Sequence, residues 1–140
     1  MRAGAVLCLV AMVGCESIGT PATVSWHGHV LHEVRSLAAL PPGIRSELGV
    51  DLPGTEGVAD RGRPFSVTDV VSHGAPFRRL LTAGRDGDTW LVALERGGRA
   101  YNVKVFLFDP DSTSKHSWIL FTRPKTLKQV VQGISRSGPS

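Results

Sequence analysis

Two glycine-containing turns constrain the fold of this chain more than any other feature. Arg85-Asp86-Gly87-Asp88 and Arg96-Gly97-Gly98-Arg99 place glycine where a tight hairpin turn requires positive φ angles. The segments beside these turns have strand length and are rich in apolar residues. We therefore expect three consecutive antiparallel strands, over residues 77–83, 89–95 and 100–108.

The segment 100–108 predicts a sheet with two different faces. Successive side chains of a strand alternate between faces, and one face of this segment is apolar throughout. That face consists of Tyr101, Val103, Val105 and Leu107. The opposite face becomes apolar only at Phe106 and Phe108. With further strands expected at 65–71 and 117–122, the sequence predicts an antiparallel β-meander of four to five strands.

Helical periodicity is expected before the meander. Apolar residues from Val30 to Leu40 recur at spacings of three and four, which predicts a helix that ends before Pro41. A second short helix is expected next, with Pro42 in its first turn and Gly49 as its C-cap. The sequence thus predicts N-terminal helices.

A C-terminal amphipathic helix is expected to pack on the sheet. Thr126 and Gln129 form a capping-box pattern, and the apolar residues that follow, up to Ile134, share one helix face. Together with the meander, these helices predict an α+β domain of two layers. A chain of 140 residues has the length of one such domain.

Residues 1–14 have a different composition from the rest of the chain. Arg2 is followed by a short apolar run from Ala5 to Val13. A bilayer-spanning helix needs about 20 apolar residues, so this run is too short to be a permanent anchor. An early positive charge, a short apolar core and small residues before a break predict a secretory signal peptide.

The end of this segment, Val13-Gly14-Cys15, resembles the lipobox of bacterial lipoproteins. Gly14 fits the small residue before the cysteine, whereas Met12 stands where the family usually has leucine. The resemblance implies that Cys15 is lipidated, and that the protein is exported and anchored to a lipid bilayer with its domain facing the periplasm. Glu16, where inner-membrane retention favours aspartate, implies the outer membrane. The alternatives are plain secretion with Cys15 unmodified and an unprocessed cytosolic chain.

Four segments follow from this interpretation. They are a signal peptide over 1–14, the lipidated cysteine with a flexible linker over 15–28, a single α+β domain over 29–135, and a disordered tail over 136–140. Because processing removes Cys8 and lipidation consumes Cys15, the mature chain would hold no free thiol. Thiolate catalysis, thiolate zinc sites and disulfides are then excluded.

A histidine cluster is the candidate metal site. His27, His29 and His32 lie close together in the sequence, and imidazole binds zinc or copper readily. The helical zinc-hydrolase motif is excluded, because Ser36 stands where its second histidine belongs. A solvated linker is the simpler interpretation, and neither a resident metal nor any other cofactor is expected.

A long loop over 49–66 holds the candidate binding residues. It is rich in glycine and proline, and Asp60, Arg61, Arg63 and Phe65 give part of it the mixed polarity of a recognition loop. A plain surface turn has the same composition. Both interpretations remain open at this point.

The C-terminal part of the chain is basic. The chain carries a formal net charge of +4, and no acidic residue follows Asp111. Five basic residues follow it: Lys115, Arg123, Lys125, Lys128 and Arg136. Anionic lipid, phosphates of the envelope or solvent alone could face them, and nucleic acid is not expected for an exported protein.

The sequence favours a small cell-envelope lipoprotein that acts as a non-catalytic accessory or binding module. It contains no nucleophile elbow, phosphate-binding glycine loop or dinucleotide fingerprint. A protein partner in the envelope is compatible with this interpretation. The first alternative is a periplasmic inhibitor or immunity protein that presents residues 60–65 to a hydrolase or toxin. The second is a hydrolase that uses His73, His116 and a carboxylate.

The lipobox resemblance predicts the outcome of metabolic labelling. Radiolabelled palmitate should enter the wild-type protein in a bacterial host and should not enter Cys15→Ser, because the thioether needs the cysteine sulfur. Gel fluorography of the immunoprecipitated protein measures the label. Absence of label from both proteins would overturn the anchor.

Overall fold

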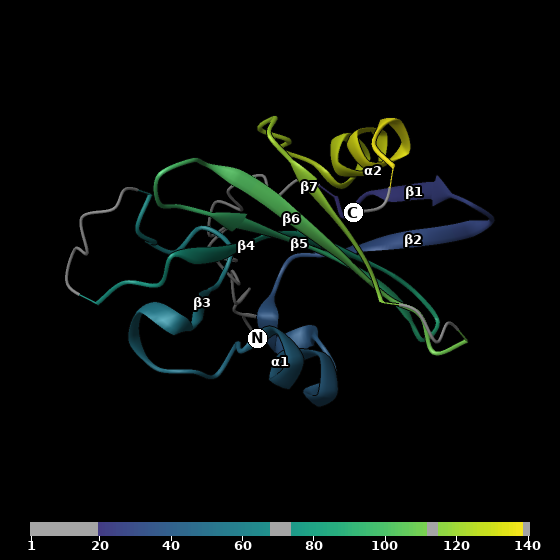
Figure 1. Ribbon diagram of the computed structural model, residues 1–140. Helices are drawn as coiled ribbons and strands as arrows, with labels where there is room; N and C mark the ends of the chain where they lie inside the picture. Colours follow the sequence, from purple (N-terminus) through teal and green to yellow (C-terminus); the bar gives the residue numbers. More distant parts are fainter. Residues whose placement is uncertain (1–19, 68–73, 112–114, 139–140) are drawn as a thin grey trace, which may run out of the picture.

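The computed structural model describes residues 20–67, 74–111 and 115–138, whose strands form one curved sheet (Figure 1). The main path of the sheet is antiparallel and has the order β1-β2-β4-β5-β6-β7. Its strands are β1 Thr23–Trp26, β2 His29–Val34, β4 Arg78–Asp86, β5 Thr89–Arg96, β6 Asn102–Phe108 and β7 His116–Leu120. The short β3, Val58–Ala59, pairs in parallel with β4 and brings the described residues to seven strands.

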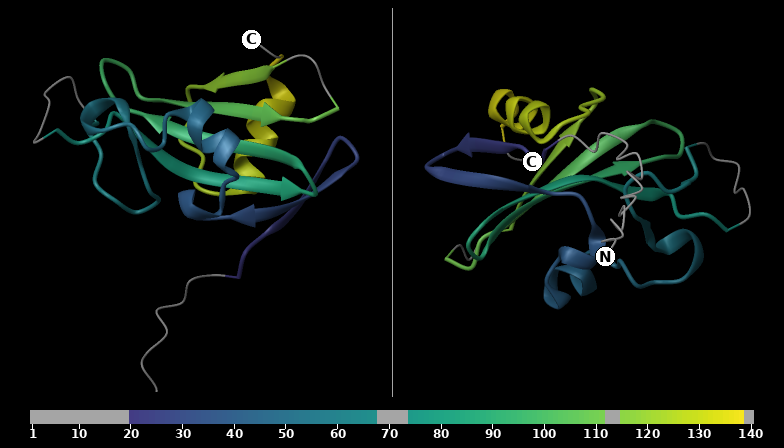
Figure 2. Two further views of the ribbon diagram at one scale, coloured as in Figure 1. Left: turned by 90° about the horizontal axis from the view of Figure 1, so that it is seen from below. Right: turned by 180° about the vertical axis from the view of Figure 1, so that it is seen from behind.

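Two α-helices lie on opposite faces of the sheet (Figure 2). α1 is Pro42–Leu48 and α2 is Leu127–Arg136. Short 3-10 helices at Leu37–Ala39 and Gly54–Glu56 flank α1 in the sequence. No helix in the described part of the chain has the length and apolar content needed to cross a membrane.

β5 is the centre of the fold, because its side chains are buried on both faces of the sheet. Leu91 and Ala93 pack in the cluster that includes α2. Trp90, Val92 and Leu94 pack in the cluster on the other face, which includes residues of α1 and the first 3-10 helix. Burying a leucine side chain stabilises a fold by roughly 1.5–3 kcal/mol, so this strand contributes to both halves of the core.

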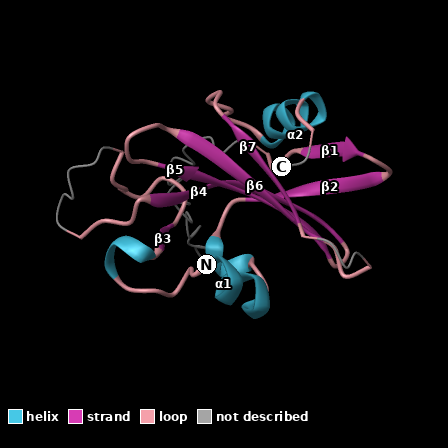
Figure 3. Cartoon of the chain, in the orientation of Figure 1, coloured by secondary structure: helices cyan, strands magenta, loops and turns pink. Residues whose placement is uncertain are grey.

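The sheet is curved, and α2 lies on its concave side between the edge strands β1 and β7 (Figure 3). Trp26 of β1 and Trp118 of β7 make an edge-to-face contact with ring centroids 5.9 Å apart. α2 contacts β1, β4 and β7 from within this concave side. The helix buries one apolar stripe there, made of Leu127, Val130, Val131 and Ile134.

The expected α+β architecture with N-terminal helices and four to five strands is wrong. The described residues form a mostly antiparallel sheet of seven strands, and β1 and β2 come before either α-helix. The helix expected over Val30 to Leu40 is instead β2 followed by a 3-10 helix. Leu31 and Glu33 both point inward, and the burial of a charged residue hid the period of two.

The N-terminal hairpin was missed for a related reason. Residues 23–26, expected within a flexible linker, form β1, which pairs with β2 through a turn at His27 and Gly28. Both turn residues have positive φ, 43° and 81°, as a two-residue hairpin turn requires. Of the strand expected at 65–71, residues 65–67 form no strand and 68–71 lie outside the described residues.

Other local predictions are confirmed. The meander of β4, β5, β6 and β7 follows the glycine turns, and the apolar face predicted for β6 packs in the α2 cluster. α1 begins at Pro42 and ends at Gly49 in a left-handed conformation. The Thr126 hydroxyl caps α2 by accepting from the Gln129 N–H, and the Gln129 side chain accepts from the Lys125 N–H. The predicted C-terminal helix does pack on the sheet.

Candidate functional site

The face of the sheet beneath α2 changes from apolar to polar toward one common end. On β2, the buried Leu31 is followed on the same face by Glu33. On β5, Ala93 is followed on that face by Glu95. β6 reaches the same end at Tyr101, and β4 supplies Arg79 opposite Glu95 and Thr82 beside Glu33. Antiparallel pairing therefore gathers polar residues from separate strands into one patch on an otherwise apolar face.

A β-bulge on β4 shapes the middle of this patch. The pairing with β5 shifts between Leu80 and Thr82, so Leu81 has no partner in the register. Leu80 belongs to the core on the α1 side, whereas Leu81 packs against the α2 cluster. The extra residue places an apolar side chain between the polar groups of β2 and β5.

Glu95 is the acid of the patch that lines the cavity described below. Its carboxylate accepts from Arg79 Nε at 2.8 Å and from the Tyr101 hydroxyl at 2.8 Å, and its side chain is 11% exposed. Burial and the hydrogen bond to Glu95 raise the pKa of Tyr101 to about 12. Arg79 also donates to the Arg63 carbonyl at 3.1 Å and lies 4.2 Å from the Phe65 ring centroid.

Glu33 is the second buried acid, and it joins four segments of the chain. It accepts from the Ala22 N–H at 2.9 Å, from Arg35 at 2.9 Å, from Arg61 at 3.3 Å and from Thr82 at 3.2 Å. Burial opposes the charged form, but the hydrogen bonds from Arg35 and Ala22 outweigh it and lower the pKa of Glu33. The carboxylate therefore stays ionised at neutral pH.

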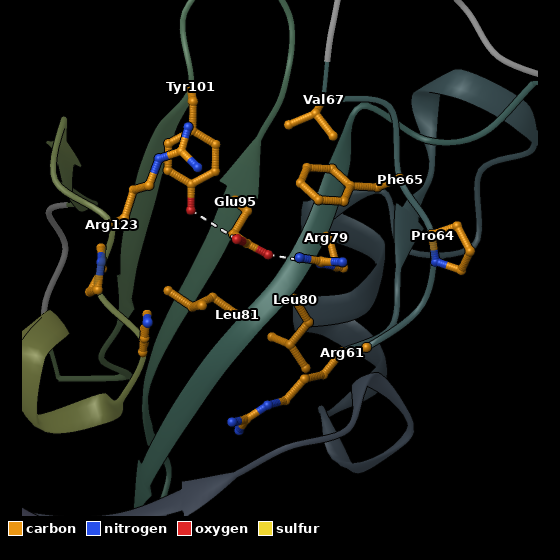
Figure 4. Close-up of a pocket in the computed structure, with 13 residues that line it drawn as sticks. Arg61, Pro64, Phe65, Val67, Arg79, Leu80, Leu81, Glu95, Tyr101 and Arg123 are labelled. Carbon is orange, nitrogen blue, oxygen red and sulfur yellow. Dashed lines mark hydrogen bonds and ion pairs between the residues drawn. The ribbon is translucent and has the colours of Figure 1, made fainter.

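A cavity of about 620 Å³ opens above this patch (Figure 4). Its floor includes Leu81, Glu95 and Tyr101. One wall is the segment that follows β3, and the other is the connection between β7 and α2. Basic residues outnumber acidic ones in its lining, where Glu95 is accompanied by Arg61, Arg79, Arg123 and Lys125.

The first wall is fastened to the turn between β5 and β6. Ser66 N–H donates to the Pro76 carbonyl at 2.7 Å, and Gly98 N–H donates to the Val67 carbonyl at 3.3 Å. A Cβ at residue 97 would lie 1.8 Å from the Ser66 carbonyl oxygen. Only glycine fits at position 97, because the backbone of the wall runs against it.

The four candidate binding residues of the loop have separate roles. Arg61 and Phe65 line the cavity. Arg63 does not, but its carbonyl oxygen accepts a hydrogen bond from Arg79. Asp60 is not in the lining; it accepts from the Leu37 N–H at 3.1 Å and from the Arg61 N–H at 2.8 Å. Asp60 thereby ties the loop to the first 3-10 helix.

The candidate metal residues are not brought together as a set. His27 lies in the hairpin turn, where its ring contacts Trp26, and His29 pairs with Asp86 at 3.2 Å. His32 is exposed on β2. Among the described residues, no three histidine, cysteine or acidic side chains converge to hold a metal ion. Cys15 and His73 lie outside the described residues.

Sequence reasoning did not predict that Glu33, Arg79, Glu95 and Tyr101 form one polar patch, and it named Arg123 only as one of the basic residues in the C-terminal part. The signal that could have found it is a charged residue at an inward position of a strand. Glu95 continues the same face as Leu91 and Ala93, where an alternating strand should stay apolar. Comparison with protein-family models, with curated proteins and with solved structures finds no match to this chain.

The Glu33 network predicts a loss of stability in acid. Glu33→Gln should lower the free energy of unfolding at pH 7 by about 1–3 kcal/mol, because Arg35, Arg61 and Thr82 lose a charged acceptor. A carboxyl whose pKa is lowered on folding stabilises above its unfolded pKa, and this stability disappears as pH falls through the folded pKa. The difference from wild type should therefore shrink at pH 3. Urea unfolding at both pH values measures it.

Glu47→Gln is the matched control for this prediction. Glu47 lies on α1, and its side chain is 40% exposed and pairs with Lys115. An exposed pair contributes less than about 1 kcal/mol, so this variant should remain close to wild type. Equal effects of the two substitutions would contradict the role of Glu33.

The close approach at Gly97 predicts a second stability effect. Gly97→Ala should lower the free energy of unfolding by about 1–3 kcal/mol, because the new methyl group must push the Ser66 backbone away. Gly43→Ala is the control, since a Cβ there meets no atom within 4 Å. Urea unfolding of both variants tests the contact, and a Gly97→Ala protein as stable as wild type would refute it.

Proposed function

We propose that this protein is a cell-envelope lipoprotein, anchored through Cys15, whose domain is a non-catalytic binding module for an anionic ligand with an apolar part. The outer membrane, with the domain facing the periplasm, is the proposed location. The observation that carries the ligand class is the cavity, whose lining holds four basic side chains and one acidic side chain. The anchor rests on the resemblance at Val13-Gly14-Cys15.

The charge balance supports an anionic ligand. Arg79 is occupied by Glu95, and Arg61 by Glu33. In the described part of the chain, neither Arg123 nor Lys125 has a carboxylate within ion-pair distance, and Arg123 instead lies 4.5 Å from the Tyr101 ring centroid. Two cations at the mouth of the cavity are therefore available to a carboxylate or phosphate group.

The apolar surfaces of the cavity support a ligand that also has hydrocarbon. Leu81 lies in the floor, and Phe65 and Val67 line the first wall. Such surfaces exclude water from the charged groups, and fewer competing waters strengthen ion pairing. A ligand with one anionic end and one apolar end matches both features.

The protonation states favour binding over proton transfer. A general acid or base needs a pKa near the working pH. The pKa of Glu33 is lowered and that of Tyr101 is raised to about 12, so neither group changes charge near neutrality. Three arginines line the cavity, and the fixed positive charge of a guanidinium suits recognition of an anion.

The position of Phe65 favours a binding module over an inhibitor or immunity protein. An inhibitory loop presents its side chains outward to an enzyme. Phe65 instead lies beneath the Arg79 guanidinium and forms part of the cavity wall (Figure 4). Phe65 therefore belongs to the wall of the cavity rather than to a projecting tip.

Binding of a model amphiphile tests the proposed cavity. Dodecyl phosphate, kept below its micellar concentration, should bind the full chain, whereas inorganic phosphate and dodecyl maltoside should bind much more weakly. Arg123→Gln should weaken binding of dodecyl phosphate about tenfold, because a charge-assisted hydrogen bond contributes roughly 1.5 kcal/mol. Isothermal titration calorimetry measures each affinity.

Lys115→Gln is the matched control for this experiment. It removes one positive charge at a cavity lined by other residues, including Glu47 and Phe108. Its affinity for dodecyl phosphate should equal that of wild type. An equal loss in both variants would show that net charge alone attracts the amphiphile, which would contradict the proposed site.

A further inference from the structure

Exposed apolar side chains gather beside the mouth of the cavity. Phe121, just after β7, is 77% exposed, and Val67 in the first wall is 48% exposed. Ile119 of β7 is 40% exposed and shares a shallow groove of about 290 Å³ with Phe121. These are three of the five large hydrophobic side chains that are exposed in the described ranges. An exposed phenylalanine beside exposed aliphatic residues marks a surface suited to a partner.

Positive charge surrounds these apolar groups. Arg123 and Lys125 follow Phe121 along the connection to α2, and both are exposed. Arg136 of α2 lines the groove that contains Phe121. No acidic residue follows Asp111 in the sequence, so the connection and the helix carry only positive charges. We call Val67, Ile119, Phe121, Arg123, Lys125 and Arg136 the cavity-end face.

The start of the described chain lies beside Glu33 of β2. The Ala22 N–H donates to Glu33, and the Thr20 carbonyl accepts from Arg35. Glu33 belongs to the polar end of the α2 face, as does Tyr101, which Arg123 contacts. An extended chain spans about 3.3–3.6 Å per residue, so a lipid on Cys15 would hold this end of the domain near the bilayer. This step alone rests on the proposed anchor.

We propose that the cavity-end face docks on an anionic lipid bilayer, with Phe121 inserted at the level of the headgroups. Aromatic side chains favour the membrane–water interface, and basic side chains close to an anionic leaflet strengthen binding. Charge complementarity selects the bilayer over a protein partner, because every charged residue from Phe121 to Arg136 is basic. Docking places the mouth of the cavity at the membrane surface, where anionic amphiphiles are found.

A site-resolved fluorescence experiment tests the docked face. An environment-sensitive dye is attached at Phe121→Cys in the full chain, with Cys8 and Cys15 replaced by serine. Vesicles of phosphatidylcholine with about 30% phosphatidylglycerol should shift the emission to the blue, because anionic lipid attracts the basic side chains of this face. Vesicles of phosphatidylcholine alone should shift it much less. Insertion of Phe121 into the interface is the cause of the expected shift.

A dye at Val30→Cys is the matched control. Val30 is 45% exposed and lies beside the hairpin turn of β1 and β2, at the other end of the sheet. If residues 1–14 alone attach the chain to vesicles, the dye emission will shift at both positions or at neither. Either result overturns the proposal. A response at position 121 alone supports it whether or not Cys15 is lipidated.

Charge variants separate this proposal from the ligand cavity. Lys125→Gln should lower partitioning to the anionic vesicles about fivefold, and Lys115→Gln should leave it unchanged. Phe121→Ser should reduce partitioning while the affinity for dodecyl phosphate stays at the wild-type value. Loss of dodecyl phosphate binding with vesicle binding intact would overturn the cavity and leave the docking face standing. Equal partitioning of Lys125→Gln and wild type would overturn the docking face.

Discussion

The ion pair between Arg79 and Glu95 determines where the apolar core ends and the polar end of the sheet begins. Both residues belong to central strands and face the side covered by α2, where Leu91, Ala93, Val103 and Val105 of the neighbouring positions form an apolar core. A buried carboxylate is strongly destabilising without a partner, and Arg79 and the Tyr101 hydroxyl satisfy it here. The apolar core therefore ends where this pair begins, and the cavity follows from that boundary.

The two covering layers of the sheet take different parts in this arrangement. α2 fills the concave side between the edge strands, and its capped first turn fixes the connection that carries Arg123 and Lys125. The segment after β3 forms the opposite wall, held by Asp60 at one end and by the contact with Gly97 at the other. Neither wall is a regular element. The first is joined by backbone hydrogen bonds to Pro76 and to the turn before β6, and the second is fixed by the cap of α2. The cavity thus has preformed sides, which favours affinity because little ordering is needed on binding.

Local sequence patterns predicted the parts of the fold where apolar and polar residues alternate regularly or where a residue type marks a helix end. The glycine turns and the apolar face of β6 located the meander, and Pro42, Gly49 and Thr126 marked helix ends. The patterns failed where a charged residue is buried. Glu33 interrupts the alternation of β2, so its apolar neighbours gave a false helical period. The seven-stranded architecture was not predicted, because the sequence of the β1–β2 hairpin was interpreted as a linker and a helix.

The candidate site shows the same limit. Arg61 and Phe65 could be selected from loop composition. Arg79 and Glu95 sit in two strands, and Tyr101 comes directly before a third, and the register of these strands is a property of the folded sheet. The carboxylate of Glu33 joins residues 22, 35, 61 and 82, which no short motif can connect. In the sequence alone, these residues are only isolated polar residues in apolar segments. Antiparallel pairing of the strands brings them together at one end of the sheet.

The most direct test of the cavity is nuclear magnetic resonance of the arginine Nε–H groups during titration with dodecyl phosphate. The cavity contains Arg61, Arg79 and Arg123, whereas Arg85 and Arg96 lie in linings elsewhere. Saturable shifts at the first three, strongest at Arg123, are the predicted result. Shifts confined to Arg85 or Arg96, or equal shifts at all five, would contradict a binding site at the polar end of the sheet.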